Sequence, residues 1–282
     1  HVYDRSIPGP AGPIAVRLYY PQAEGPLPAL VYFHGGGFVI GDLDTHDPVA
    51  RRLCAATGAI VCAVDYRLAP EYPFPAAPND AAAATEWMLE NAATLGADPE
   101  RVTVIGDSAG GMLALVSAMR LRGHAPPLSG QVLIYPMADY YEPGTASYRE
   151  FAEGYGLTRE SMIWFWRHYL PDPALADHPE VSPLRATDLS GLPPTLVITA
   201  EYDVLRDEGE ALAERLAAAG VPVTRSRVPG LHHGFIRLFA ILDEAQQTID
   251  SIAYWLEAKR EAVLAAAAAT AEPAPGAADA PA

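Results

Sequence analysis

The sequence predicts an α/β fold in which helices flank a mostly parallel central sheet on both faces. Short apolar, β-branched runs recur along the 282 residues, and helical patterns separate most of them. This alternation is typical of parallel strands joined by crossover helices. Half of the residues (50%) are hydrophobic, which is enough for a core of ordinary domain size. We therefore expect a single α/β domain over residues 1–264.

The strands are predicted from apolar runs that end in turn residues. The first covers residues 14–20, alternates roughly, and is expected at an antiparallel edge of the sheet. The others follow in chain order at 29–33, 59–64, 101–105, 131–135, 195–199 and 223–228. Helical periodicity lies between most of them, at 47–57, 76–95, 109–122 and 205–219. A last helix is expected at about 241–262, packing through Ile249, Ile252, Trp255 and Leu256.

A long insertion separates the strands at 131–135 and 195–199. It is too long for a crossover loop and contains an aromatic-rich helix at 158–170, with Trp164, Phe165, Trp166 and Tyr169. We interpret residues 139–190 as a helical cap. These aromatic side chains are candidates for lining a substrate pocket, although at least half of them are expected to pack the cap against the body.

Residues 106–110 read Gly-Asp-Ser-Ala-Gly and lie between a predicted strand and a predicted helix. A G-x-S-x-G motif in this context predicts a nucleophile elbow, which exposes its serine at the N-terminus of a helix. Gly106 and Gly110 lack the Cβ atoms that would collide in so tight a turn. Ser108 is therefore the predicted nucleophile, and Asp107 is expected to be structural.

A second glycine-rich turn, His-Gly-Gly-Gly-Phe at residues 34–38, follows another apolar strand. Acyl transfer needs fixed N–H donors for an oxyanion, and glycines let the main chain approach the substrate. We predict that the N–H groups of Gly36, Gly37 and Ala109 form the oxyanion hole. His34 is expected to support this loop, as is a buried ion-pair network involving Arg67 and Glu71.

The acid and the base of a serine hydrolase should follow the nucleophile in that order along the chain. Asp203 comes after the strand at 195–199, at the edge where open α/β sheets place their sites. Glu201 and Asp207 are alternatives, although Asp207 is also explained by the first turn of the next helix. Both His232 and His233 follow the strand at 223–228 and are candidate bases.

Four motifs together resemble the hormone-sensitive-lipase-like esterases, also called bacterial lipolytic family IV. They are His-Gly-Gly-Gly-Phe at 34–38, Asp-Tyr-Arg-Leu-Ala-Pro-Glu at 65–71, Gly-Asp-Ser-Ala-Gly-Gly at 106–111 and His-Gly-Phe at 233–235. The resemblance extends over about residues 4–256. It implies an α/β-hydrolase fold with a helical cap and a carboxylesterase activity on short acyl esters. It also favours His233 as the base, because His233 directly precedes Gly-Phe.

Two departures from the family pattern stand out. Residues 203–205 read Asp-Val-Leu where many members have Asp-Pro-Leu, a change that leaves the carboxylate in place. Members usually carry several tens of residues, part of the cap, before the equivalent of residues 2–5. This chain begins at His1, so we expect that it is trimmed or that this part of the cap is absent.

These assignments predict a serine carboxylesterase that hydrolyses short-to-medium acyl esters through Ser108, His233 and Asp203 and an acyl-enzyme. An amidase, lactonase or deacetylase acting on a natural product is the alternative within hydrolases, because such enzymes share a triad and differ in pocket shape. A ligand-binding homologue without turnover, like the gibberellin receptors, lacks the histidine. The presence of all three residues therefore disfavours a pure binding role.

Composition and charge limit the classes of partner that the protein is expected to bind. The chain has 19 basic and 35 acidic residues and a net charge of −16, which argues against nucleic acid and anionic membranes as partners. The histidines show no metal-ligand spacing, and no phosphate or dinucleotide motif is present, so neither a metal nor a cofactor is expected. Cys54 and Cys62 are interpreted as buried, unpaired residues.

The remaining expectations concern location and assembly. No signal peptide or transmembrane run is visible, which makes the cytoplasm the default location and stable membrane insertion unexpected. The expected partner is a small-molecule ester, and the expected assembly is a monomer or homodimer. Residues 265–282 are rich in Ala and Pro and are predicted to form a disordered tail.

Overall fold

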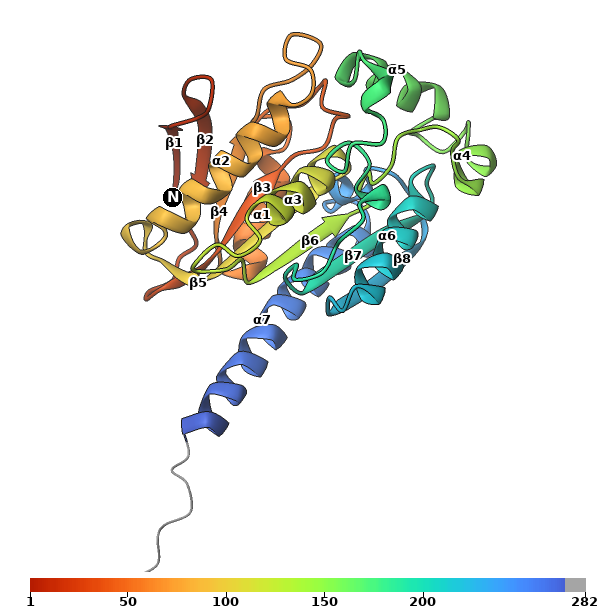
Figure 1. The fold of residues 1–282 in the computed structure, drawn as a ribbon. Helices are drawn as coiled ribbons and strands as arrows, with labels where there is room; N and C mark the ends of the chain where they lie inside the picture. Colours follow the sequence, from red (N-terminus) through yellow and green to blue (C-terminus); the bar gives the residue numbers. More distant parts are fainter. Residues whose placement is uncertain (272–282) are drawn as a thin grey trace, which may run out of the picture.

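The computed structural model describes the backbone of residues 1–271 and the side chains of residues 1–259 and 261. Eight strands form one sheet in the order β1-β2-β4-β3-β5-β6-β7-β8 (Figure 1). The pairs β1–β2 and β2–β4 are antiparallel and all other neighbours are parallel, which confirms the mostly parallel sheet. The strands are β1 (Val2–Ile7), β2 (Ile14–Tyr19), β3 (Leu27–Phe33), β4 (Ile60–Asp65), β5 (Ala97–Asp107), β6 (Gly130–Ile134), β7 (Thr195–Tyr202) and β8 (Val223–His232).

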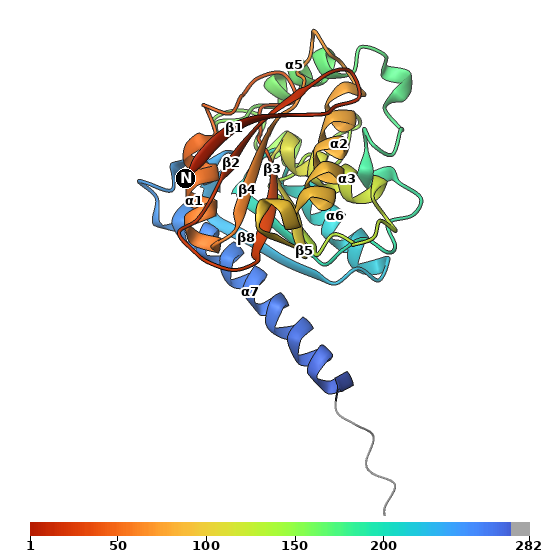
Figure 2. The ribbon, with the colours of Figure 1, turned by 90° about the vertical axis from the view of Figure 1, so that its left-hand side faces the viewer.

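Helices cover both faces of the sheet (Figures 1 and 2). Helices α1 and α7 bury their apolar side chains on one face, and α2, α3 and α6 bury theirs on the other. The central strands are therefore buried on both sides, which explains their continuous apolar runs. The helices are α1 (Asp47–Thr57), α2 (Ala76–Asn91), α3 (Ala109–Arg120), α6 (Arg206–Ala218) and α7 (Asp243–Ala271), with short 3₁₀ helices η1 (Ala93–Leu95) after α2 and η4 (Phe235–Leu238) after β8.

The antiparallel edge of the sheet differs from the sequence prediction. The strand expected at residues 14–20 is antiparallel, but as β2 it lies second in the sheet. The edge strand is β1, which the sequence analysis missed. Residues 3–6 of β1 are exposed, and an edge strand that covers no core needs no apolar alternation.

The last helix is longer than predicted. Helix α7 continues to Ala271, beyond the expected end at residue 262, and projects away from the body (Figures 1 and 2). Alanine has the highest helix propensity of all residues, and residues 265–269 are all alanine. The predicted disorder of residues 272–282 falls outside the described part of the chain.

The chain between β6 and β7 lies above the carboxyl ends of the parallel strands (Figure 1). It contains α4 (Ala146–Glu150), α5 (Arg159–Tyr169) and the 3₁₀ helices η2 (Pro173–Leu175) and η3 (Pro183–Arg185). Helix α5 begins after Thr158, whose side-chain oxygen accepts a hydrogen bond from the N–H of Ser161 at 3.0 Å. Of its aromatic residues, Trp166 and Tyr169 are fully buried, whereas Trp164 is exposed.

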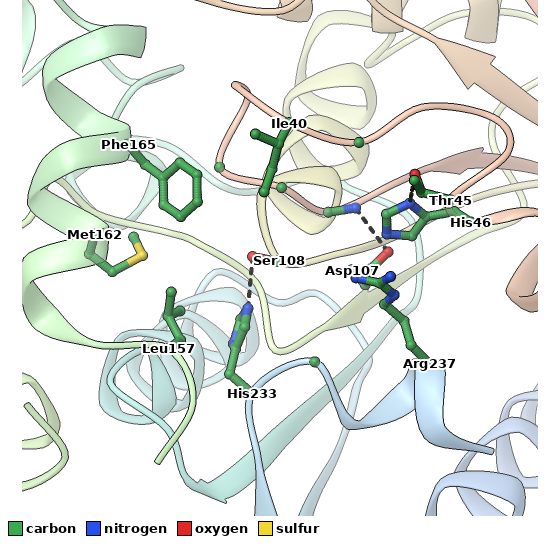
Figure 3. Close-up of a pocket in the computed structure, with 15 residues that line it drawn as sticks. Ile40, Thr45, His46, Asp107, Ser108, Leu157, Met162, Phe165, His233 and Arg237 are labelled. Carbon is green, nitrogen blue, oxygen red and sulfur yellow. Dashed lines mark hydrogen bonds between the residues drawn. The ribbon is translucent and has the colours of Figure 1, made fainter. Parts of the chain in front are cut away.

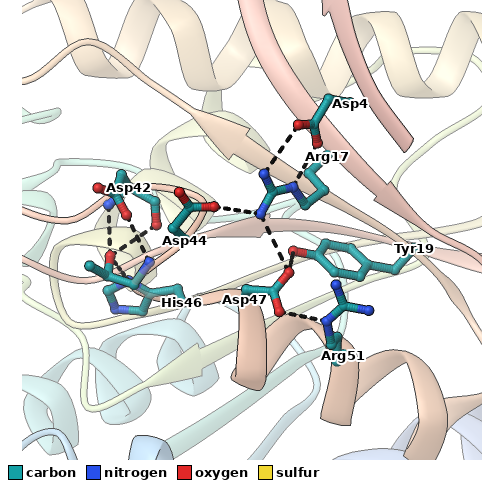
Figure 4. A network of polar contacts seen from close by, with 9 residues as sticks. Asp4, Arg17, Tyr19, Asp42, Asp44, His46, Asp47 and Arg51 are labelled. Atoms are coloured by element: carbon teal, nitrogen blue, oxygen red, sulfur yellow. Dashed lines mark hydrogen bonds and ion pairs between the residues drawn. The ribbon is translucent and has the colours of Figure 1, made fainter. Parts of the chain in front are cut away.

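A network of charges joins the N-terminal hairpin to the start of α1 (Figure 4). The guanidinium of Arg17, on β2, binds both carboxylate oxygens of Asp4, on β1, at 2.6 and 3.1 Å. It also donates to Asp44 at 2.8 Å and to Asp47 at 3.4 Å. The hydroxyl of Tyr19 donates to Asp47 at 2.9 Å. The loop before α1 is therefore tied to the hairpin through one arginine that is only 17% exposed.

Candidate active site

The predicted nucleophile lies in a tight turn between β5 and α3. Ser108 has φ 57° and ψ −122°, a conformation that non-glycine residues rarely adopt. The glycines on either side allow this turn. A Cβ on Gly106 would lie 2.2 Å from the carbonyl oxygen of Gly110, and one on Gly110 would lie 2.0 Å from that of Phe33. The chain thus holds the Ser108 hydroxyl at the N-terminus of α3, where it is 7% exposed.

Three side chains from the carboxyl ends of three strands form a continuous hydrogen-bonded line. The Nε2 atom of His233 lies 2.9 Å from Oγ of Ser108 (Figure 3), and its Nδ1 lies 2.7 Å from Oδ2 of Asp203. The other oxygen of Asp203 accepts the backbone N–H of Leu205 at 2.9 Å. The Asp203 carboxylate has no exposed surface and the His233 side chain is 10% exposed. The three groups thus form the hydroxyl–imidazole–carboxylate arrangement of a serine hydrolase.

The three alternatives from the sequence make other contacts. His232 is exposed, and its Nδ1 lies 2.8 Å from the next carbonyl oxygen along the chain. Glu201 accepts the backbone N–H of Gly230 at 2.7 Å, so it braces the loop after β8. Asp207 accepts the backbone N–H of Ser147 at 2.8 Å, which ties α4 to α6. The structure therefore brings Asp203, not these carboxylates, to the candidate base.

Two of the three predicted oxyanion donors, Gly36 and Gly37, line the same cavity as the serine. In the described part of the chain, the N–H groups of Gly36, Gly37 and Ala109 donate no hydrogen bond to another residue. Gly36 has φ 126°, and a Cβ there would lie 2.0 Å from the carbonyl oxygen of Ile40. Gly37 has φ 59°, and a Cβ there would lie 2.3 Å from the ring of Phe165. Both positions require glycine, and both leave an N–H group for a ligand.

Aromatic rings pack against the first residue of the glycine-rich loop at 34–38. The ring of His34 stacks on Tyr66 at 4.4 Å and on His46 at 5.0 Å between centroids. The Tyr66 hydroxyl donates to the carbonyl oxygen of His34 at 2.7 Å. Burial lowers the pKa of His34 to about 4, so its imidazole is neutral near pH 7. Its role is therefore structural.

The ion pair beside the glycine-rich loop differs from the predicted one. Arg67 pairs with Asp80 of α2 through two hydrogen bonds of 2.8 Å, whereas Glu71 is exposed. Asp107 has a structural contact too, because its Oδ1 accepts the hydroxyl of Tyr32 at 2.8 Å and the N–H of Gly35 at 3.1 Å. The expected Arg67–Glu71 network is wrong, because the buried partner of Arg67 is Asp80 in the following helix α2.

The serine opens into a cavity of about 390 Å³ whose two sides differ (Figure 3). Three apolar side chains of the β6–β7 insertion lie on one side, and three polar ones from the body lie on the other, with Ser108 between them. The apolar side chains are Leu157, Met162 and Phe165, and the polar ones are Thr45, His46 and Arg237.

The sequence analysis did not place the three polar residues at the site. One signal for Arg237 was present: it lies four residues after His233, and the 3₁₀ helix η4 turns it back toward the cavity. Thr45 and His46 lie in the loop that follows the glycine turn at 34–38. No local sequence pattern predicts that this loop folds back to the cavity.

A buried carboxyl group lies at the base of the β6–β7 insertion. Glu208, in the first turn of α6, is 1% exposed, and its Oε1 accepts the N–H of Ala138 at 2.8 Å. Burial raises the pKa of Glu208 well above its ordinary value, and the nearby charges of Asp139 and Asp203 raise it further. The chain at the start of the insertion is therefore bound by a carboxyl group that resists ionisation.

We expect Glu208→Gln to stabilise the protein at alkaline pH. Because the folded-state pKa is raised, this carboxyl group contributes stability below its ordinary pKa of 4.5 and loses it as the pH rises through the folded value. Glutamine resembles the protonated form and does not titrate. The Tm of the variant relative to that of wild type should therefore rise as the pH increases from 5 to 8. Parallel curves of Tm against pH for the two proteins would contradict this.

Three further properties concern the described residues alone. No group of three or more His, Cys, Asp or Glu side chains there is placed to hold a metal ion. No helix there is long and apolar enough to cross a membrane. Cys54 and Cys62 are buried, and neither is in a disulfide.

Comparison with known proteins places this geometry in a family. A family model described as the alpha/beta hydrolase fold matches residues 30–237. The chain is 44% identical over 253 residues to the esterase LipI of Mycobacterium tuberculosis, covering 87% of this chain and 78% of that protein. It is 41% identical to an ethyl acetate hydrolase of Pseudomonas putida, covering 83% and 75%. A hyperthermophilic esterase from the archaeon Pyrobaculum calidifontis superposes with a TM-score of 0.88 at 46% identity, covering 92% and 85%. The chain therefore belongs to the α/β-hydrolase family, among the hormone-sensitive-lipase-like esterases.

Proposed function

We propose that this protein is a carboxylic ester hydrolase that acts on short-to-medium acyl esters with Ser108 as nucleophile. The observation that carries the proposal is the hydrogen-bonded line from Ser108 through His233 to Asp203, which opens into the cavity. The names of the relatives support ester hydrolysis as the reaction, because they include an esterase and an ethyl acetate hydrolase.

The geometry supports a two-step mechanism. As Oγ of Ser108 attacks the ester carbonyl, Nε2 of His233 takes its proton, and Asp203 stabilises the imidazolium that forms. The N–H groups of Gly36, Gly37 and Ala109 stabilise the oxyanion. His233 then gives the proton to the leaving alcohol, which leaves an acyl-enzyme. Water, deprotonated by His233, attacks the acyl carbonyl and releases the acid.

The β6–β7 insertion supports the preference for short acyl groups. We assign residues 139–190 as the cap, since Leu157, Met162 and Phe165 close one side of the cavity. A volume of about 390 Å³ lies near the lower end of the range of small-ligand sites. A cytoplasmic location, a monomer or homodimer and the absence of nucleic-acid partners stay predictions from the sequence.

Hydrolysis of a p-nitrophenyl ester series from acetate to palmitate tests this function. We expect the highest kcat/KM with acetate or butyrate and a decline of about 100-fold or more toward palmitate, because a small cavity excludes long chains. p-Nitroacetanilide serves as the amide control and should react far more slowly than the acetate ester. Faster cleavage of the anilide would favour the amidase alternative, and no ester turnover by a folded protein would contradict the proposal.

A further inference from the structure

The polar side of the cavity presents a cation to the reaction centre. Arg237 lies in η4, directly after the loop that carries His233, and lines the same cavity as Ser108. Its side chain extends from η4 toward Asp107 and His46 (Figure 3). An arginine here places a permanent positive charge, with several N–H donors, beside the site of ester cleavage.

No carboxylate of the described chain pairs with this arginine. Within residues 1–259 and 261, the guanidinium of Arg237 takes part in no salt bridge and donates no hydrogen bond, whereas those of Arg17 and Arg67 are each held by aspartates. Asp107 is the one acidic residue that lines the cavity in this part of the chain, and its Oδ1 is occupied by Tyr32 and Gly35. The Arg237 charge is thus available to a ligand.

Two neighbouring groups extend this polar side. Nδ1 of His46 lies 3.1 Å from Oγ1 of Thr45, and both residues line the cavity. Burial lowers the pKa of His46 and outweighs the nearby Asp107 carboxylate, which raises it, so the imidazole stays neutral near pH 7. A neutral imidazole and a hydroxyl can each hydrogen-bond an oxygen anion without adding a competing charge.

From this arrangement we propose that the enzyme prefers esters that carry a carboxylate over neutral esters of the same size, and that Arg237 binds this carboxylate on the Thr45–His46 side of the cavity. The apolar remainder of the ester packs on the side formed by Leu157, Met162 and Phe165. The inference rests on the proposed ester hydrolysis at Ser108.

Two matched substrate pairs test the inference. 4-Acetoxybenzoate and 4-acetoxybenzamide differ by one charge on the alcohol side of the ester. Phenyl hydrogen succinate and phenyl succinamate differ by one charge on the acyl side. For at least one pair, we expect the ratio of kcat/KM for the anionic to the neutral ester to fall by about tenfold in Arg237→Gln, chiefly through KM. Arg237→Lys, which keeps the charge, should retain most of the wild-type ratio.

Arg149→Gln is the matched control, because it removes an exposed arginine of α4 that does not line the cavity. It should leave both ratios at the wild-type value. Unchanged ratios in Arg237→Gln, with the neutral esters still hydrolysed, would overturn the inference and leave the proposed function standing. An equal loss of kcat/KM for charged and neutral esters would also overturn it, since Arg237 would then act only by compensating the negative charge of Asp107. No hydrolysis of any ester by wild type would overturn the inference and the proposed function together.

Discussion

Ser108→Ala should lower kcat for p-nitrophenyl acetate by about 10⁵-fold or more, because it removes the attacking oxygen and leaves the rest of the site in place. Alanine keeps the Cβ atom and the backbone of the turn, so the fold should be unaffected. Stopped assays at high enzyme concentration measure the residual rate, and thermal unfolding measures the stability.

Ser117→Ala is the matched control for this variant. Ser117 lies in the same helix α3 and is fully buried, and its hydroxyl has no hydrogen-bond partner in the described part of the chain. Its removal should leave kcat near the wild-type value. A Ser108→Ala enzyme with a few per cent of wild-type activity, free of contaminating esterase, would exclude Ser108 as the nucleophile.

His233→Ala should cause a loss of similar size, about 10⁵-fold in kcat, because Ser108 would lose its proton acceptor and the leaving alcohol its proton donor. The adjacent histidine provides a sharp control. His232→Ala removes an exposed ring that contacts neither Ser108 nor Asp203, and it should change kcat by less than about threefold. The p-nitrophenyl acetate assay compares both variants. The reverse pattern, an inactive His232→Ala and an active His233→Ala, would show that the base is assigned to the wrong residue.

The sequence predicts the centre of this site well because its motifs reflect backbone constraints. Gly106 is required by a close backbone contact within the turn, and Gly110 by the backbone of Phe33 on the neighbouring strand. Gly36 and Gly37 have positive φ values, which exclude most other residues. Such constraints fix the residue type at positions close together in the chain, so they leave a pattern in the sequence.

The parts that the sequence did not predict depend on contacts between distant segments. Asp80, in helix α2, pairs with Arg67 of the loop after β4, and the polar side of the cavity combines the loop at 45–46 with Arg237. The edge strand β1 was missed because it is recognised by its pairing with β2 and not by an apolar face. Hydrophobic periodicity reports which side chains are buried, and these residues are mostly polar and exposed.

The network around Arg17 limits how pieces of this enzyme can be exchanged with those of its relatives. Asp4 and Arg17 belong to the N-terminal hairpin, whereas Asp44 and Asp47 belong to the segment that also carries pocket residues. A chimera whose new hairpin lacked an arginine at position 17 would leave Asp44 and Asp47 without their shared cation, on either side of the cavity-lining residues 45–46. Recombination breakpoints should therefore fall after residue 47, so that the hairpin and this segment are inherited as one block.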